Sequence, residues 1–79
     1  MAINQMHYHV ILEIGFSKDQ ERYHTYGLQA EETGSYGNNT LAVIHDVTTD
    51  FALAKHMAKM FNKHQLSMVH LYEAVEEAL

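Results

Sequence analysis

The chain has 79 residues, of which 47% are hydrophobic and 19% are charged. These figures are typical of one small globular domain, which we place at residues 1–79. The absence of cysteine excludes disulfides, thiolate metal sites and cysteine nucleophiles. Ten acidic residues outnumber five basic ones, which argues against a nucleic-acid partner, because phosphate binding requires a concentration of Lys and Arg.

Seven histidines are the unusual feature of the composition. Protonation near the ordinary histidine pKa of about 6.5 adds seven positive charges to a formal net charge of −5. An acid-responsive change of association is therefore one hypothesis for the function.

The N-terminal residues lack the basic and apolar segments of a secretory signal, so we expect a cytoplasmic location. Uninterrupted apolar runs such as residues 10–12 are far shorter than the roughly 18 residues of a membrane span. We therefore expect no membrane partner.

Alternation with period two predicts two strands, at residues 8–16 and at about 23–31, joined by a polar turn at 17–21. A hairpin centred near Asp19 places Val10 opposite Leu28, so that the apolar residues of the two strands share one face. The even positions are expected to point toward the core: Tyr8, Val10, Leu12, Ile14, Phe16, His24, Tyr26, Leu28 and Ala30.

A surface loop at residues 33–39 and a third strand at residues 40–47 follow. The inward face of this strand is ambiguous. Leu41, Val43 and Val47 alternate one way, whereas Ala42 and Ile44 alternate the other.

Two helices complete the predicted fold. The first runs from Asp50 to His64, where Thr49 or Asp50 can accept its free amide hydrogens, and the second begins at the cap Ser67 and continues to about Glu77. The order β-β-β-α-α indicates an α+β fold, a three-stranded antiparallel meander with both helices on one face. The inward helical positions are expected to be Leu53, Ala54, Met57, Met60, Phe61, Met68, Leu71, Tyr72, Val75 and Leu79.

The segments 44–50 (Ile-His-Asp-Val-Thr-Thr-Asp) and 65–79 (Gln-Leu-Ser-Met-Val-His-Leu-Tyr-Glu-Ala-Val-Glu-Glu-Ala-Leu) resemble a small family of uncharacterised proteins found in Firmicutes, a domain of unknown function. Residues 26–28 (Tyr-Gly-Leu) match it more weakly. In that family a proline commonly stands where this chain has Met68. The resemblance covers roughly the C-terminal half and implies a bacterial origin without implying an activity.

His7 and His9 form the one histidine pair with chelating spacing, because alternate residues of a strand point the same way. The hairpin register places His7 opposite Glu31, which offers a carboxylate. These three residues are the candidate ligands of a divalent transition metal. The alternative interpretation is a pair of solvent-facing histidines on the outer sheet face.

The other histidines are interpreted as structural. We expect His24 at the edge of the core and His45 and Asp46 on opposite faces of their strand, with Asp46 helping at the helix entrance. His56 is expected in solvent and His64 in the last helical turn. His70 is placed between the two helices.

Two charged stripes indicate an interaction surface, either within the molecule or with a second copy. The first helix carries Lys55, Lys59 and Lys63, and the last helix carries Glu73, Glu76 and Glu77, with His70 nearby. The open edges of the meander offer a second route to association, with Ile11 and Tyr23 adding apolar surface.

The chain has no nucleophile elbow, zinc-protease motif, phosphate loop or dinucleotide fingerprint. We therefore expect no enzymatic activity and no cofactor other than the candidate metal. The leading hypothesis is a small protein-interaction or regulatory domain that forms a homodimer, and the alternative is a histidine-dependent metal-binding protein.

Overall fold

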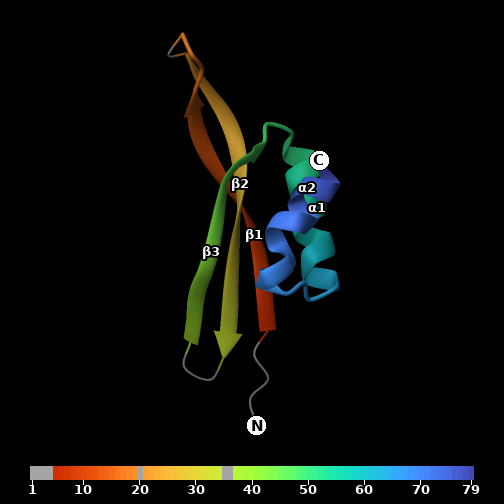
Figure 1. Cartoon of the computed structure of the whole chain (residues 1–79). Coiled ribbons are helices and arrows are strands. Elements are labelled where there is room, and N and C mark those ends of the chain that lie inside the picture. The colour runs from red at the N-terminus through yellow and green to blue at the C-terminus, as the bar shows by residue number, and fades with distance from the viewer. Residues whose placement is uncertain (1–4, 20, 35–36) are drawn as a thin grey trace.

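A computed structural model describes residues 5–19, 21–34 and 37–79 (Figure 1). Three antiparallel strands form one sheet in the order β1-β2-β3, and two helices follow. This architecture confirms the predicted α+β fold. The elements are β1 (Gln5–Phe16), β2 (Arg22–Gly34), β3 (Gly37–Thr48), α1 (Phe51–Lys63), a 3-10 turn (Met68–His70) and α2 (Leu71–Ala78).

The predicted hairpin register is confirmed. Val10 pairs with Leu28, Ile14 with His24, and His7 with Glu31. The strands are longer than predicted, because β2 runs to Gly34 and β3 begins at Gly37, within the segment expected to be a loop.

A bulge in β3 explains why the inward face of this strand was ambiguous. Leu28 pairs with Ile44, but Tyr26, two residues away on β2, pairs with Thr48, so β3 carries two additional residues here. Because two residues are added, the pairs on either side of this bulge keep the same parity, whereas a second irregularity adds one residue, Leu41, between the pairs Ala30–Ala42 and Glu31–Thr40 and reverses it. Ala42 and Ile44 pack against the core before the bulge, and Val47, which lies within the bulge, packs against the core as well.

α1 begins where Asp50, one of the two expected caps, accepts a hydrogen bond from the Leu53 amide at 3.2 Å. Its buried face matches the expected stripe, with Ala58 added and with Met60 and Leu53 only partly buried. The buried residues of α1 are Ala54, Met57, Ala58 and Phe61.

The last helix differs from the prediction. Ser67 accepts from the Val69 amide, as expected of a cap, but a 3-10 turn follows and α2 begins only at Leu71. Leu71 and Val75 alone are buried on α2, because two residues four apart are all that a two-turn helix presents to one surface. The inward placement of three residues is therefore wrong, since Met68, Tyr72 and Leu79 are exposed.

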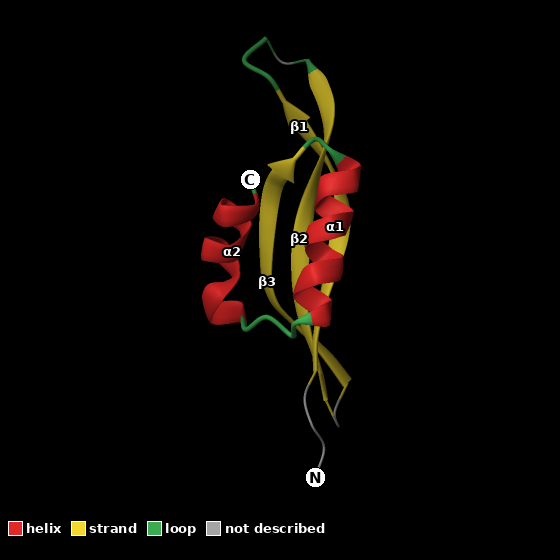
Figure 2. Ribbon diagram, turned by 90° about the vertical axis from the view of Figure 1, so that its right-hand side faces the viewer, coloured by secondary structure: helices red, strands yellow, loops and turns green. Residues whose placement is uncertain are grey.

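Both helices cover the same face of the sheet, α1 beside α2 (Figure 2). The core lies between the helices and the half of the sheet that contains the start of β1, which we call the proximal half. There the Tyr8 and Phe61 rings meet edge to face, with 5.6 Å between their centroids. Burial raises the pKa of Tyr8, whose hydroxyl donates to the Leu66 carbonyl. None of the described helices has the length and apolar character needed to cross a membrane.

The sheet is longer than its helical cover. The 13 residues of α1 span about 20 Å, whereas the 12 residues of β1 span about 40 Å. The distal half of the β1–β2 hairpin therefore projects beyond both helices and beyond the end of β3 (Figure 1). The molecule is correspondingly elongated, with extents of 52 × 25 × 19 Å.

Candidate functional site

The projecting part of β1 carries three apolar side chains on the face that the helices cover farther along the sheet. Leu12 and Phe16 are each 65% exposed and Ile14 is 55% exposed. We call these three residues the distal stripe. Phe51 at the start of α1 is 51% exposed and packs against Tyr26 with 5.2 Å between ring centroids. The apolar surface is thus continuous from the helix to the hairpin, since Tyr26 is the strand partner of Leu12.

The expected inward orientation of the even positions is only partly correct. Tyr8, Leu28 and Ala30 are buried, but the distal stripe has no helix above it. His24 is likewise exposed, so its placement at the edge of the core is wrong. The alternation identified the face correctly, but it contains no information on how far the cover extends.

Two side chains, one from the last turn of α1 and one just after this helix, occupy the proximal edge of β1. Asn62 Oδ1 accepts from the Tyr8 amide at 2.7 Å, and Asn62 Nδ2 donates to the Tyr8 carbonyl at 3.0 Å. Gln65 makes the same pair of bonds with Met6, at 3.0 and 3.1 Å. These two amides take the place of a neighbouring strand.

The distal edge of β1 has no such cover. Because backbone groups alternate in direction along an antiparallel strand, even-numbered residues of β1 direct their N–H and C=O groups away from β2, as Met6 and Tyr8 show. Among the described residues, no second strand and no side-chain amide pairs with this edge, the one facing away from β2, beyond Tyr8. We call this main chain, from Val10 to Phe16, the open edge.

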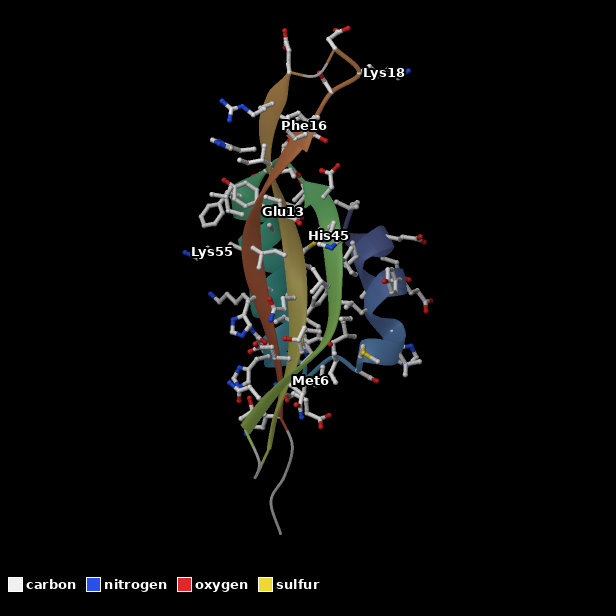
Figure 3. All side chains as sticks on the ribbon, turned by 90° about the vertical axis from the view of Figure 1, so that its left-hand side faces the viewer. Met6, Glu13, Phe16, Lys18, His45 and Lys55 are labelled. Carbon is white, nitrogen blue, oxygen red and sulfur yellow. The ribbon has the colours of Figure 1, made fainter. Side chains whose placement is uncertain are left out.

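The outer face behind the open edge is held by a polar network, the bulge cluster, formed by Glu13, Tyr23, Thr25, His45 and Asp46. Glu13 extends from β1 across β2, where its carboxylate accepts from the Asp46 amide at 2.9 Å and bonds to His45 Nδ1 (Figure 3). Burial raises the pKa of Glu13, but the hydrogen bonds from His45 and the Asp46 amide outweigh it, and the net pKa is below its ordinary value.

Asp46 is the centre of this cluster and has a positive φ of 51°, a conformation that costs about 1 kcal/mol or more in a non-glycine residue. Its carboxylate compensates by accepting from the Tyr23 hydroxyl at 3.1 Å and from buried Thr25 at 2.6 Å. The bond to Asp46, together with burial, raises the pKa of Tyr23. Gly27 provides the space, because a Cβ there would lie 2.5 Å from Glu13 Oε1.

The bulge overturns two expectations. His45 and Asp46 were placed on opposite faces, but the bulge lets both bond to Glu13. Asp46 does not help at the helix entrance, where Asp50 is the cap. Hairpin alternation predicts neither the bulge nor the cluster, because the two additional residues appear only when β3 is paired with β2.

The three candidate metal ligands lie together on the outer face of the proximal sheet. The rings of His7 and His9 stack with 6.1 Å between centroids, and His9 Nε2 lies 3.1 Å from Glu31 Oε2. Gln29 also donates to Glu31, at 3.1 Å. Within the described residues, no group of three or more His, Asp or Glu side chains is arranged to hold a metal ion.

The two charged stripes are exposed on different sides of the molecule. The side chain of Lys55 projects on the side away from α2 (Figure 3), and Lys59 and Lys63 are exposed on the same helix. No ion pair between described residues joins them to the exposed Glu73, Glu76 and Glu77 of α2.

The three helical histidines are all exposed. His56 has the expected solvated position, and His64 is the C-cap residue of α1, bonded through its amide to the Met60 carbonyl at 3.0 Å. His70 ends the 3-10 turn in the connection between the two helices. Ile11 and Tyr23 are half-buried on the outer face.

An apolar groove of about 390 Å³ separates α1 from α2. Met57, Met60 and Phe61 line one side, and Ala74 and Ala78 line the other. The groove is open to solvent along the outer surface of the helical layer and is distinct from the open edge.

A model of a family of unknown function, DUF6514, matches residues 2–79. The chain belongs to DUF6514. The match includes β1 and β2, so the family extends over nearly the whole chain and not only over the C-terminal half that carried the resemblance. No curated protein and no solved structure matches the DUF6514 chain.

Proposed function

We propose that this DUF6514 chain is a small non-enzymatic binding domain that pairs with a polypeptide strand along the open edge of β1. The observation that carries the proposal is the coincidence, over residues 10–16, of free main-chain groups with the exposed distal stripe. Strand addition uses both features: main-chain hydrogen bonds supply affinity, and alternate side chains supply specificity.

The condition of the rest of β1 supports this proposal. An unpaired edge beside exposed apolar side chains promotes uncontrolled association unless it is covered or blocked. The proximal edge is blocked by Asn62 and Gln65, so the same strand is protected at one end and open at the other. This difference favours a bounded binding segment over a general weakness of the edge.

The bulge cluster supports a binding role for this segment. Its side chains bond to one another, with Glu13 joined to His45 and Asp46 joined to Tyr23 and Thr25. The cluster connects Glu13 of β1 to β3 across β2 and thereby fixes the middle of the open segment from the outer face. A partner strand would therefore meet a pre-organised template, which lowers the entropic cost of binding.

Site-specific photocrosslinking tests the proposal. A benzophenone amino acid replaces Phe16 in one variant and Tyr72 in the other, the two sites being 65% and 63% exposed. We expect the Phe16 variant, expressed in the native cell, to capture a polypeptide that the Tyr72 variant does not capture. Equal capture at both sites, or none at Phe16, would contradict strand addition at the open edge.

A further inference from the structure

We propose that the strand that binds the open edge is β1 of a second copy, paired antiparallel about Glu13 to form a continuous six-stranded sheet. This inference rests on the proposed function and names its partner. The two copies are related by a two-fold axis, as in most homodimers. This axis is perpendicular to the sheet. Both helical layers then lie on the same side of the joined sheet.

The direction of the backbone groups fits this arrangement. Even-numbered residues face the open edge, so they pair with even-numbered residues of the second copy. About an axis at Glu13, Val10 lies opposite Phe16 of the second copy and Leu12 lies opposite Ile14. All four edge residues in the open segment thus obtain partners, and none is left over.

This register is favoured over the two neighbouring registers because each of those would pair an edge residue with main chain that is already bonded or that belongs to the turn. If the axis passed through Leu12, Phe16 would lie opposite Tyr8 of the second copy, whose backbone N–H and C=O already bond to Asn62. If it passed through Ile14, Val10 would lie opposite Lys18, which follows the end of β1 and belongs to the turn. In the register at Glu13, the pairing stops at Val10 of each copy, just before Tyr8, whose main chain is already bonded to Asn62.

The same register brings the distal stripes of the two copies side by side on one face of the joined sheet. Ile14 and Phe16 of one copy come beside Leu12 and Val10 of the other, next to its Phe51. Given their exposed fractions, the distal stripe and Phe51 leave about 400 Å² of apolar side chain uncovered in each copy. Doubled, and with the paired main chains added, this area sets an upper limit near the roughly 1,200 Å² at which specific interfaces begin.

Charge and helix placement are compatible with this dimer. α1 runs from Phe51, beside Tyr26, to Asn62 at Tyr8, so it leads away from the axis and the two lysine rows diverge. The two Glu13 residues lie opposite each other at the axis and are the one acidic pair there. Its carboxylate is bonded toward β3, away from the open edge, by His45 and the Asp46 amide.

Sedimentation equilibrium of the purified chain tests the proposal. We expect a dimer at micromolar concentration and, for Ile14→Lys, a dissociation constant raised about 100-fold or more, the effect of removing a central interface side chain. Val69→Lys is the matched control, because Val69 is a β-branched residue 81% exposed on the 3-10 turn. This control should dimerise like the parent chain.

Engineered cysteines test the register without interference, since the chain has none. Glu13→Cys should form a disulfide dimer on mild oxidation. Ile11→Cys should not, because the two Ile11 residues would lie about 13 Å apart, beyond disulfide reach. A mixture of Leu12→Cys and Ile14→Cys chains leaves Glu13 intact and should cross-link as the mixed pair.

The outcomes separate this inference from the proposed function. A monomeric chain whose Phe16 photocrosslinks to another protein would overturn the homodimer and leave strand addition standing. A dimer insensitive to Ile14→Lys, or Leu12→Cys alone cross-linking more readily than Glu13→Cys, would overturn the proposed pairing. Failure of capture at Phe16 together with a monomeric chain would overturn both.

Discussion

Asn62 is expected to stabilise the fold by acting as a substitute strand at the edge of β1. Its side-chain amide makes two hydrogen bonds with Tyr8, at 2.7 and 3.0 Å, and both are partly buried. A net contribution of about 1 kcal/mol for each bond gives a loss of about 2 kcal/mol for Asn62→Ala. For a domain of this size, that loss lowers Tm by about 8–16 °C.

A conservative variant separates the two bonds. Asn62→Asp keeps an acceptor for the Tyr8 amide but loses the donor to the Tyr8 carbonyl. We expect its stability to fall between those of the parent chain and Asn62→Ala. Gln65→Ala is a useful comparison, because Gln65 makes equivalent bonds to Met6 in an exposed position and should cost less.

Urea denaturation followed by circular dichroism measures these differences at neutral pH. If Asn62→Ala lost less than about 0.5 kcal/mol, or if Asn62→Asp matched the parent chain, the amide would not be replacing a strand at Tyr8. Asn62→Ala should also extend the open edge toward the N-terminus. Light scattering should then detect larger assemblies than in the parent chain.

Three further predictions concern the outer face of the sheet. Because the pKa of Glu13 is lowered in the folded chain, its carboxylate contributes stability that is complete above the ordinary pKa of 4.5 and is lost as pH falls below it. Glu13→Gln should therefore weaken the loss of stability between neutral and acid pH. An unchanged acid part of the curve of stability against pH would refute this. Gly27→Ala should destabilise by about 1–3 kcal/mol in urea denaturation, because its Cβ would lie 2.5 Å from the Ile44 carbonyl oxygen; stability equal to that of the parent would contradict the close approach. If the chain binds a divalent metal through His7 and His9, replacing both with Ala should remove the metal from untagged protein, and an equal metal content in the variant would end that hypothesis.

The local elements could be predicted from the sequence because their signals are local. Polar–apolar alternation identified the hairpin and placed Val10 against Leu28, and Asp50 was one of two residues expected to cap α1. The β-β-β-α-α order followed from the change of period at residues 48–50. Each of these inferences depends on a few neighbouring residues and on the geometry of a single element.

The phase of β3 was decided only by tertiary pairing. The two additional residues opposite Gly27 interrupt the alternation, so that Val47 packs against the core as well as Ile44, and neither residue type nor spacing identifies them. The same bulge unites His45 and Asp46 with Glu13, 32 and 33 residues away along the chain. A contact over that separation depends on how strands register with one another.

The location of the candidate site was also decided by the tertiary structure. Leu12, Ile14 and Phe16 continue the alternation of Tyr8 and Val10, so the sequence by itself established that they share the inner face. Whether that face is covered depends on the relative reach of two kinds of element. A helix rises about 1.5 Å per residue and a strand about 3.3 Å, so helices of 13 and eight residues leave the distal half of the hairpin uncovered.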